Sequence, residues 1–220
     1  YSGTPSPQWL QRFQAKDVDW YKHVDDKSLK TYKRHLVFVR PSTVIIYDEL
    51  AASKTADWDW RIHTPNEMQL TEFGVSTNNV GGRGDLRLFT SKPFIASVTD
   101  KALHKPFNVD GRTVKVKGKT DVYKDIGWHY NAKITEAKNV RVLAIIDISN
   151  KKAKPATVTE LSDGTIQVGE VLIKAELNAN KPASLQVILS DGRVLKAGNH
   201  LATLSSKSGN QVAEQIKLLN

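Results

Sequence analysis

The chain has 220 residues, no cysteine, and a formal net charge of +9, because 32 Lys and Arg residues outnumber 23 Asp and Glu residues. This composition excludes disulfide bonds and thiol chemistry, and no run reaches the roughly 18 apolar residues that a membrane span needs. The hydrophobic content of 40% is typical of a folded protein. The basic balance favours an anionic partner, although Lys residues spread over loops and strand edges would explain it equally well. The chain begins at Tyr1 without a signal-like apolar core, so we expect a processed product or a fragment.

The first residues favour one short helix in SPQWLQRFQAK (6–16), where Ser6 can cap it and Pro7 suits its first turn. After this segment the pattern changes to short runs of alternating or continuous β-branched and aromatic residues. These runs predict strands at 35–40, 43–50, 58–63, 68–73, 85–90, 94–99, 112–118, 127–134, 140–148, 157–161, 165–169, 171–177, 184–190 and 193–198.

The connections between these runs favour antiparallel pairing. Asp110-Gly111, Asp163-Gly164 and Asp191-Gly192 are Asp-Gly pairs that suit tight hairpin turns, and no long amphipathic helix links one run to the next. The continuous apolar runs VIIY (44–47) and VLAIID (142–147) are typical of central strands covered on both faces. We therefore expect an all-β protein, an antiparallel β-sandwich with one short N-terminal helix.

A lysine-rich stretch, NKKAKPA (150–156), follows the apolar run and is the best candidate for a boundary. We expect a main β-sandwich domain at 1–150 and a smaller C-terminal β-sheet portion at 151–220, packed on the first.

The stretch DWDWRIH (57–63) alternates strictly between polar and apolar residues. In an extended strand Trp58, Trp60 and Ile62 fall on one face, and the polar residues, including Arg61 and His63, fall on the other. The aromatic face can pack in the core and the polar face can bind. A lone His is also often a simple strand-end residue, and that alternative stays open for His63.

The longer stretch YKRHLVFVRPSTVIIYDELAASKTADWDWRIHTP (32–65) resembles the start of the β-sandwich module of heparinase II/III-like polysaccharide lyases. It has a basic residue opening an apolar strand, a Pro-containing turn, a second apolar strand ending in Asp, and a Trp-containing strand ending in His. The resemblance implies a periplasmic or secreted bacterial enzyme that cleaves uronate-containing polysaccharides, heparin-like or alginate-like, by β-elimination. It also implies that most catalytic groups lie on a preceding α/α toroid, so the catalytic residues cannot be assigned here and the chain is expected to be inactive without that domain.

The resemblance further implies a structural zinc ion held by two His and one Asp. Asp48 and His63 occupy the matching places, whereas His35 lies later than the family's third ligand. Zinc requires three or four donors that converge on one point. A salt bridge from Asp48 to Arg34, Arg40 or Arg61 is the competing interpretation, because a buried carboxylate needs a cation or several hydrogen-bond donors.

Trp128 and His129 lie in a second aromatic cluster, GWHYNAKI (127–134). Alternation places Trp128 with Tyr130 on one face and His129 on the other, and core packing of the two aromatic rings competes with a role in sugar binding. Together with Arg61 and His63, Trp128 and His129 are the candidate residues for binding an acidic polysaccharide.

The same composition is compatible with two other functions. A noncatalytic carbohydrate-binding or adhesion module would use the same basic and aromatic residues and would need no toroid. Nucleic-acid binding is suggested by the charge, but the aromatic residues are not interleaved with Lys and Arg in a recognisable pattern, so we expect no nucleic-acid partner. The chain has no P-loop, no Gly-x-Ser-x-Gly elbow and no His-Glu-x-x-His motif.

Overall fold

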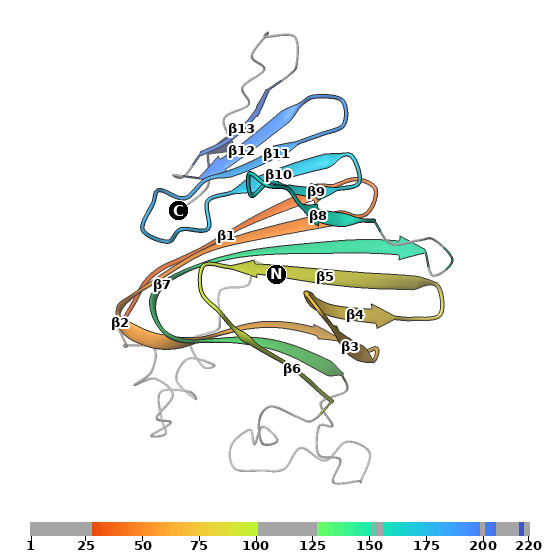
Figure 1. Ribbon diagram of the computed structural model, residues 1–220, viewed down its shortest axis with the longest axis horizontal. Helices are drawn as coiled ribbons and strands as arrows, with labels where there is room; N and C mark the ends of the chain where they lie inside the picture. The colour runs from red at the N-terminus through yellow and green to blue at the C-terminus, as the bar shows by residue number, and fades with distance from the viewer. Residues whose placement is uncertain are drawn as a thin grey trace, which may run out of the picture.

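The computed structural model describes residues 28–100, 127–150, 152, 156–198, 201–205 and 216–217. Within these residues the chain forms fourteen strands and no helix, and the strands build two antiparallel sheets (Figure 1). The expected all-β sandwich class is confirmed. The helix expected at 6–16 and the strand expected at 112–118 lie outside the described residues.

The first sheet contains seven strands in the order β1-β2-β7-β5-β4-β3, with β6 also paired to β7. Two of these strands are unusually long: β2 (Thr43–Thr64) has 22 residues and β7 (Trp128–Asn150) has 23. The others are β1 (Leu29–Val39), β3 (Met68–Thr71), β4 (Gly74–Asn78), β5 (Gly82–Thr90) and β6 (Ile95–Thr99).

Strands β2 and β7 bend together, so that their two halves lie one above the other in Figure 1. The bend coincides with register shifts between Ala51 and Trp58 and with a positive φ of 50° at Glu136 on the facing strand. Irregularities of this kind sharpen the local twist and bend of a strand. The first sheet is thereby folded over on itself.

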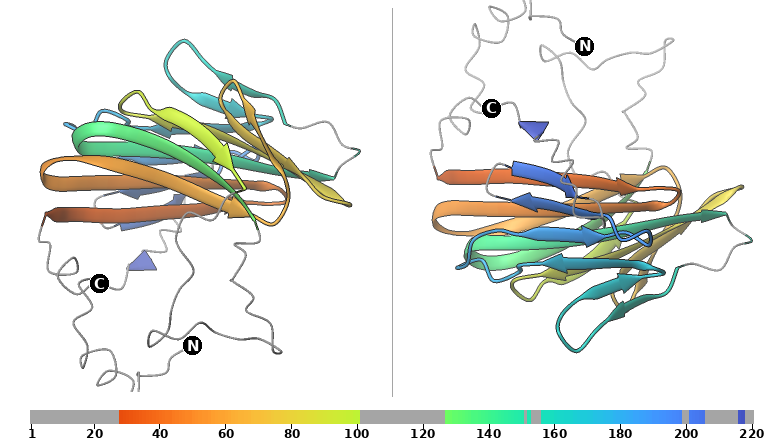
Figure 2. Two further views of the ribbon diagram at one scale, coloured as in Figure 1. Left: turned by 90° about the horizontal axis from the view of Figure 1, so that it is seen from below. Right: turned by 90° about the horizontal axis from the view of Figure 1, so that it is seen from above.

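The second sheet has the order β14-β13-β12-β11-β10-β9-β8 and follows the chain from neighbour to neighbour. Its strands run in roughly the same direction as those of the first sheet (Figure 2), as in aligned sandwiches. They are β8 (Val158–Glu160), β9 (Ile166–Val168), β10 (Val171–Ala175), β11 (Leu185–Ile188), β12 (Val194–Gly198), β13 (Leu201–Ser205) and β14 (Ile216–Lys217).

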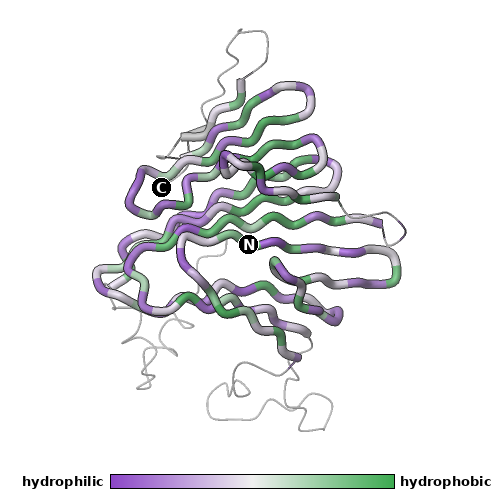
Figure 3. Tube along the Cα trace, in the orientation of Figure 1, coloured by the Kyte–Doolittle hydropathy of each residue, from purple (hydrophilic) through white to green (hydrophobic). Residues whose placement is uncertain are grey.

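Two hydrophobic cores result from this arrangement. One lies between the two sheets and includes Ile45 and Leu143 from the first sheet and Ile173 and Leu185 from the second. The other lies inside the folded first sheet, and its residues include Trp60, Tyr130 and Val142. Hydrophobic residues accordingly follow the middle of the central strands, and hydrophilic residues gather at strand ends and turns (Figure 3).

The first half of β2 and the second half of β7 therefore have a core on each side. This explains the continuous apolar runs at 44–47 and 142–147, and it confirms the prediction that both runs are covered on both faces. The chain passes from one sheet to the other between Asn150 and Val158. Because the sheets share a core, they are layers of one sandwich.

The prediction of separate strands at 43–50 and 58–63 was wrong, because they are one strand, and the same holds for 127–134 and 140–148. The connecting residues are polar or small and gave no apolar pattern, yet the strand continues through them, with Ala51 paired to Asn139 and Ala56 to Ala137. The strand expected at 68–73 is shorter than predicted: β3 ends at Thr71, and the next two residues form the hairpin turn that leads to β4.

No helix in the described part of the chain is long and apolar enough to cross a membrane.

Candidate functional site

The second half of β2 has the two faces that its alternation predicts. Trp60 is buried in the core of the folded sheet, and Trp58 and Ile62 pack against that core. Asp57, Asp59, Arg61 and His63 point to the other face and are exposed. The sequence therefore separates a core-forming side from a solvent-facing side within one strand.

The neighbouring strand β7 extends this solvent-facing side. His63 pairs with His129, Arg61 with Asn131, and Asp59 with Lys133 across the two strands. We call the surface formed by these six residues and Asp57 the polar face. Asn131 and Lys133 were not among the candidates from the sequence, although alternation within GWHYNAKI places them on the same side as His129.

Hydrogen bonds connect the middle of the polar face. Nη2 of Arg61 donates to Oδ2 of Asp59 at 3.0 Å, and Nε donates to Oδ1 of Asn131 at 3.4 Å. Nδ2 of Asn131 donates in turn to Oδ1 of Asp59 at 2.9 Å. These three side chains hold one another in place, which fixes the direction of the guanidinium group of Arg61.

One end of the polar face carries an ion pair between Lys133 and Asp57, with Nζ and Oδ2 at 2.9 Å. Their hydrogen bond raises the pKa of Lys133 and lowers the pKa of Asp57, so both groups stay charged over a wide pH range. Both side chains are about half exposed, so the pair contributes little to stability.

The other end carries two imidazole rings in direct contact. The Nδ1 atoms of His63 and His129 face each other, and the rings meet edge to face with their centroids 4.5 Å apart. His63 is exposed, whereas His129 is only 3% exposed. One Nδ1 must carry the proton and the other must accept it, so the contact requires at least one neutral ring. His63 is the ring that a ligand can reach directly.

Trp128 does not join the polar face. It lies on the opposite side of β7 and packs partly buried against the core of the folded sheet, near Tyr130, which is fully buried. Of the four candidate binding residues, the structure thus brings together Arg61, His63 and His129 and separates Trp128 from them. Core packing, the competing interpretation for Trp128, describes its position.

Asp48 is buried, with 1% of its surface exposed, on the inner side of the folded sheet. Arg34 on the adjacent strand binds it through two parallel bonds, Nε to Oδ1 at 2.7 Å and Nη2 to Oδ2 at 2.8 Å. Nε1 of Trp60 donates a third bond to Oδ2 at 2.9 Å. The hydrogen bond to Asp48 is the main reason that the pKa of Arg34 is raised. The structure therefore contains the salt bridge of the competing interpretation, and Arg34 is its cation.

The three candidate zinc ligands do not converge. Asp48 is bound by Arg34 and Trp60, Nε2 of His35 lies 2.8 Å from Oε1 of Glu49, and His63 contacts His129. His35 and Arg34 are consecutive residues of β1 and therefore point to opposite faces. Among the described residues no three His, Cys, Asp or Glu side chains are grouped closely enough to hold a metal ion. The arrangement does not fit the zinc site that the family resemblance implies, and zinc binding stays an untested prediction.

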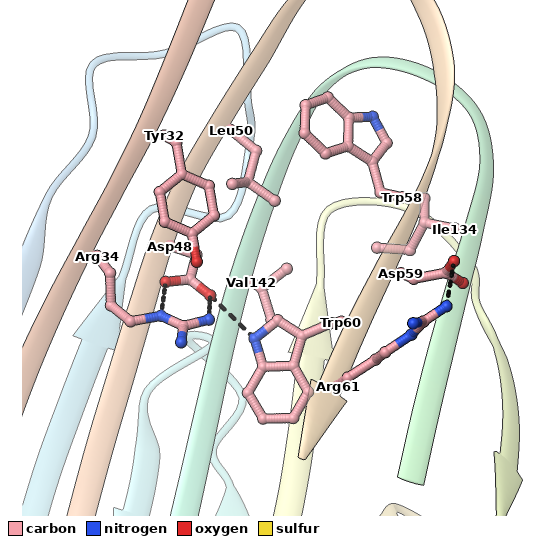
Figure 4. Close-up of a pocket in the computed structure, with 10 residues that line it drawn as sticks. All are labelled: Tyr32, Arg34, Asp48, Leu50, Trp58, Asp59, Trp60, Arg61, Ile134 and Val142. Carbon is pink, nitrogen blue, oxygen red and sulfur yellow. Dashed lines mark hydrogen bonds and ion pairs between the residues drawn. The ribbon is translucent and has the colours of Figure 1, made fainter. Parts of the chain in front are cut away.

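A pocket of about 250 Å³ opens beside the Arg34–Asp48 pair, between β1 and the second half of β2 (Figure 4). Its walls are largely aromatic and aliphatic, and two Asp–Arg pairs line it: Asp48 with Arg34, and Asp59 with Arg61. The full lining is Tyr32, Arg34, Asp48, Leu50, Trp58, Asp59, Trp60, Arg61, Ile134 and Val142. Sequence reasoning did not find this pocket, because it depends on the fold of β2 back over β1.

Comparison with known proteins gives no further assignment. No protein-family model matches the chain, and no relative is found among curated proteins.

Proposed function

We propose that this chain is the β-sandwich portion of a polysaccharide lyase of the heparinase II/III type, acting on a uronate-containing acidic polysaccharide. The observation that carries the proposal is the polar face, where Arg61, Asn131 and His63 lie side by side at the surface. Guanidinium groups bind carboxylates through paired N–H donors, and amide and imidazole groups bind hydroxyls. A sugar acid offers both kinds of partner.

Arg61 supports this assignment because it is held in place without being saturated. Two of its three nitrogens donate to Asp59 and Asn131, and the side chain remains 36% exposed. A guanidinium group has five N–H donors, so donors remain for a carboxylate. The net charge of +9 adds a long-range attraction for a polyanion.

In this proposal the chemistry is shared with a preceding α/α toroid domain. A base removes the proton α to the uronate carboxylate, the electron pair forms a carbon–carbon double bond, and the 4-linked sugar leaves with a proton from an acid. Neutralising the uronate carboxylate makes that proton more acidic. The polar face binds the acidic chain beside the cleft, with His63 nearest to it, and the protein works in the periplasm or outside the bacterial cell.

The binding step is tested with one variant and a matched control. Arg61→Ala and Arg193→Ala each remove one exposed Arg that pairs with an Asp two residues earlier, but Arg193 lies in a hairpin of the second sheet. Calorimetry with oligosaccharides of heparan sulfate and of alginate should show affinity lowered about tenfold or more by Arg61→Ala, the effect of losing a charged hydrogen bond. Arg193→Ala should change it less than about twofold.

Equal losses in both variants would mean that only overall charge attracts the glycan, and equal binding of a neutral polysaccharide would rule out an acidic substrate. The lyase part of the proposal needs the full-length protein. There His63→Ala should slow formation of the unsaturated uronate product, which absorbs ultraviolet light, while leaving the fold intact. Binding without any such product from the unmodified protein would identify a noncatalytic carbohydrate-binding module instead.

A further inference from the structure

A second hollow, of about 520 Å³, lies where the two sheets meet at the bend of β7. We call it the bend groove. Three segments line it: residues 90–92 between β5 and β6, residues 136–139 at the bend of β7, and residues 177–180 between β10 and β11. Figure 1 shows the bend and the connection from β10 to β11 at the same end of the sandwich. The groove therefore combines parts of both sheets.

Hydrogen bonds fix two of the three walls of the bend groove. The backbone N–H of Ser91 donates to the carbonyl oxygen of Arg141, and the backbone N–H of Arg141 donates to Oγ of Ser91, both at 3.0 Å. On the side of the second sheet, the hydroxyl of Tyr47 donates to the carbonyl oxygen of Glu176 at 2.7 Å, directly before residues 177–180. These walls are in place before any ligand arrives, which lowers the entropic cost of binding.

The bend groove presents two lysines without acidic partners. Lys92 and Lys138 are exposed, and within the described part of the chain neither makes an ion pair. Glu136 is the one acidic side chain in the lining, so the groove carries a net positive charge. Three side-chain amides, which can donate further N–H bonds, complete its polar lining: Asn139, Asn178 and Asn180. Such a lining suits an anionic group that also accepts hydrogen bonds.

The bend groove continues the polar face around the bend. The backbone N–H of Glu136, in the wall of the groove, donates to Oδ1 of Asp57 at 3.1 Å. The other oxygen of the same carboxylate binds Lys133 at 2.9 Å, at the end of the polar face. One side chain thus contacts both surfaces, and a polymer lying along the polar face can pass directly into the groove.

We infer that the bend groove is a second subsite for the acidic polysaccharide, which a long chain occupies together with the polar face. The inference rests on the proposed function for the identity of the ligand. Lys138 lies seven residues beyond Asn131, the partner of Arg61, so these two points of β7 are at most ~24 Å apart along the strand. A short oligosaccharide fills the polar face alone, whereas a long one also reaches Lys92 and Lys138. Binding at two linked points raises the affinity of the long chain.

The dependence of affinity on chain length tests the inference. Calorimetry compares tetrasaccharides with dodecasaccharides of alginate and of heparan sulfate, and the unmodified protein should bind the dodecasaccharide at least about tenfold more tightly. Lys92→Ala/Lys138→Ala should remove most of this gain, with a loss of about fivefold or more for the dodecasaccharide and less than about twofold for the tetrasaccharide. In nuclear magnetic resonance spectra, the dodecasaccharide alone should shift the side-chain amide signals of the three groove residues Asn139, Asn178 and Asn180.

The matched control is Lys30→Ala/Lys196→Ala. It removes the same charge from two exposed Lys residues that lie outside the groove and make no ion pair among the described residues. Both affinities should then change by less than about twofold.

Three results would overturn the inference: an unchanged dodecasaccharide affinity in Lys92→Ala/Lys138→Ala, an equal loss in the control, or unmoved amide signals. Equal losses for both chain lengths would also reject a separate subsite. Failure here remains distinct from failure of the proposed function. If Arg61→Ala weakens both oligosaccharides and the groove variant weakens neither, the polar face stands and only the bend groove is rejected. If neither oligosaccharide binds the unmodified protein, the proposed function fails and the inference fails with it.

Discussion

Each half of β2 contributes the Asp of an Asp–Arg pair, and the two pairs differ in burial and in hydrogen bonding. Asp48, in the first half, is 1% exposed and accepts two bonds from Arg34 and a third from Trp60. Asp59, in the second half, is 38% exposed and shares Arg61 with solvent. A buried carboxylate must be compensated by its partners, whereas an exposed one is solvated with or without them. The same pair of residue types therefore stabilises the fold in one half and leaves donors for a ligand in the other.

The largest expected effect comes from breaking the buried pair. Asp48→Ala removes the carboxylate and leaves the indole N–H of Trp60 buried without its acceptor. We expect the free energy of unfolding to fall by about 3 kcal/mol, the lower end for a buried pair because Arg34 is 39% exposed and can regain water. Urea unfolding followed by tryptophan fluorescence measures the loss. A loss below about 1 kcal/mol would mean that the pair is no more important than an exposed one.

A smaller change in stability, of opposite sign, is expected at Tyr130, which lies on β7 beside the second half of β2. Tyr130 lies opposite Ile62 and is fully buried, and its hydroxyl has no hydrogen-bond partner within the described residues. Tyr130→Phe removes this unsatisfied group and should raise stability by about 1 kcal/mol at neutral pH. Tyr32→Phe, at an exposed position, is the control and should have no effect.

The same variant should also change the alkaline limit of stability. Burial raises the pKa of Tyr130 from its ordinary value of 10.0 to about 12, so the folded state holds the phenolic proton more tightly than the unfolded chain. Titration of Tyr130 therefore leaves the free energy of unfolding unchanged below about pH 10 and lowers it as the pH rises from about 10 to about 12. Urea unfolding across this range should show a shallower decline for Tyr130→Phe than for the unmodified protein. Parallel declines would contradict the assignment.

The smallest effect is expected for the exposed pair. Asp59→Ala should lower the free energy of unfolding by less than about 1 kcal/mol, because Arg61 remains solvated and can still bind Asn131. Unfolding in urea, compared directly with Asp48→Ala, measures the contrast between the two halves. A loss as large as that of Asp48→Ala would show that the polar face is part of the structural framework, which would weaken its assignment to binding.

Local sequence pattern predicted the elements that depend on side-chain alternation. Trp58 and Trp60 on one side of the strand and Arg61 and His63 on the other follow directly from the period of an extended chain. The double coverage of the runs at 44–47 and 142–147 also followed from their continuous apolar character. The residues at 51–57 and 135–139 gave no such signal, so the sequence could not predict that β2 and β7 continue through them and bend there.

Contacts between distant segments were not predictable in the same way. The sequence alone determined an all-β chain with strands of defined polarity, because alternation and turn residues act locally. Only the tertiary structure decided that Arg34, rather than Arg40, Arg61 or zinc, neutralises Asp48, that Trp128 faces the core, and that Tyr32 and Trp58 enclose a pocket. Each of these depends on strand register and on the bend of β2, which arise from the packing of the whole sandwich.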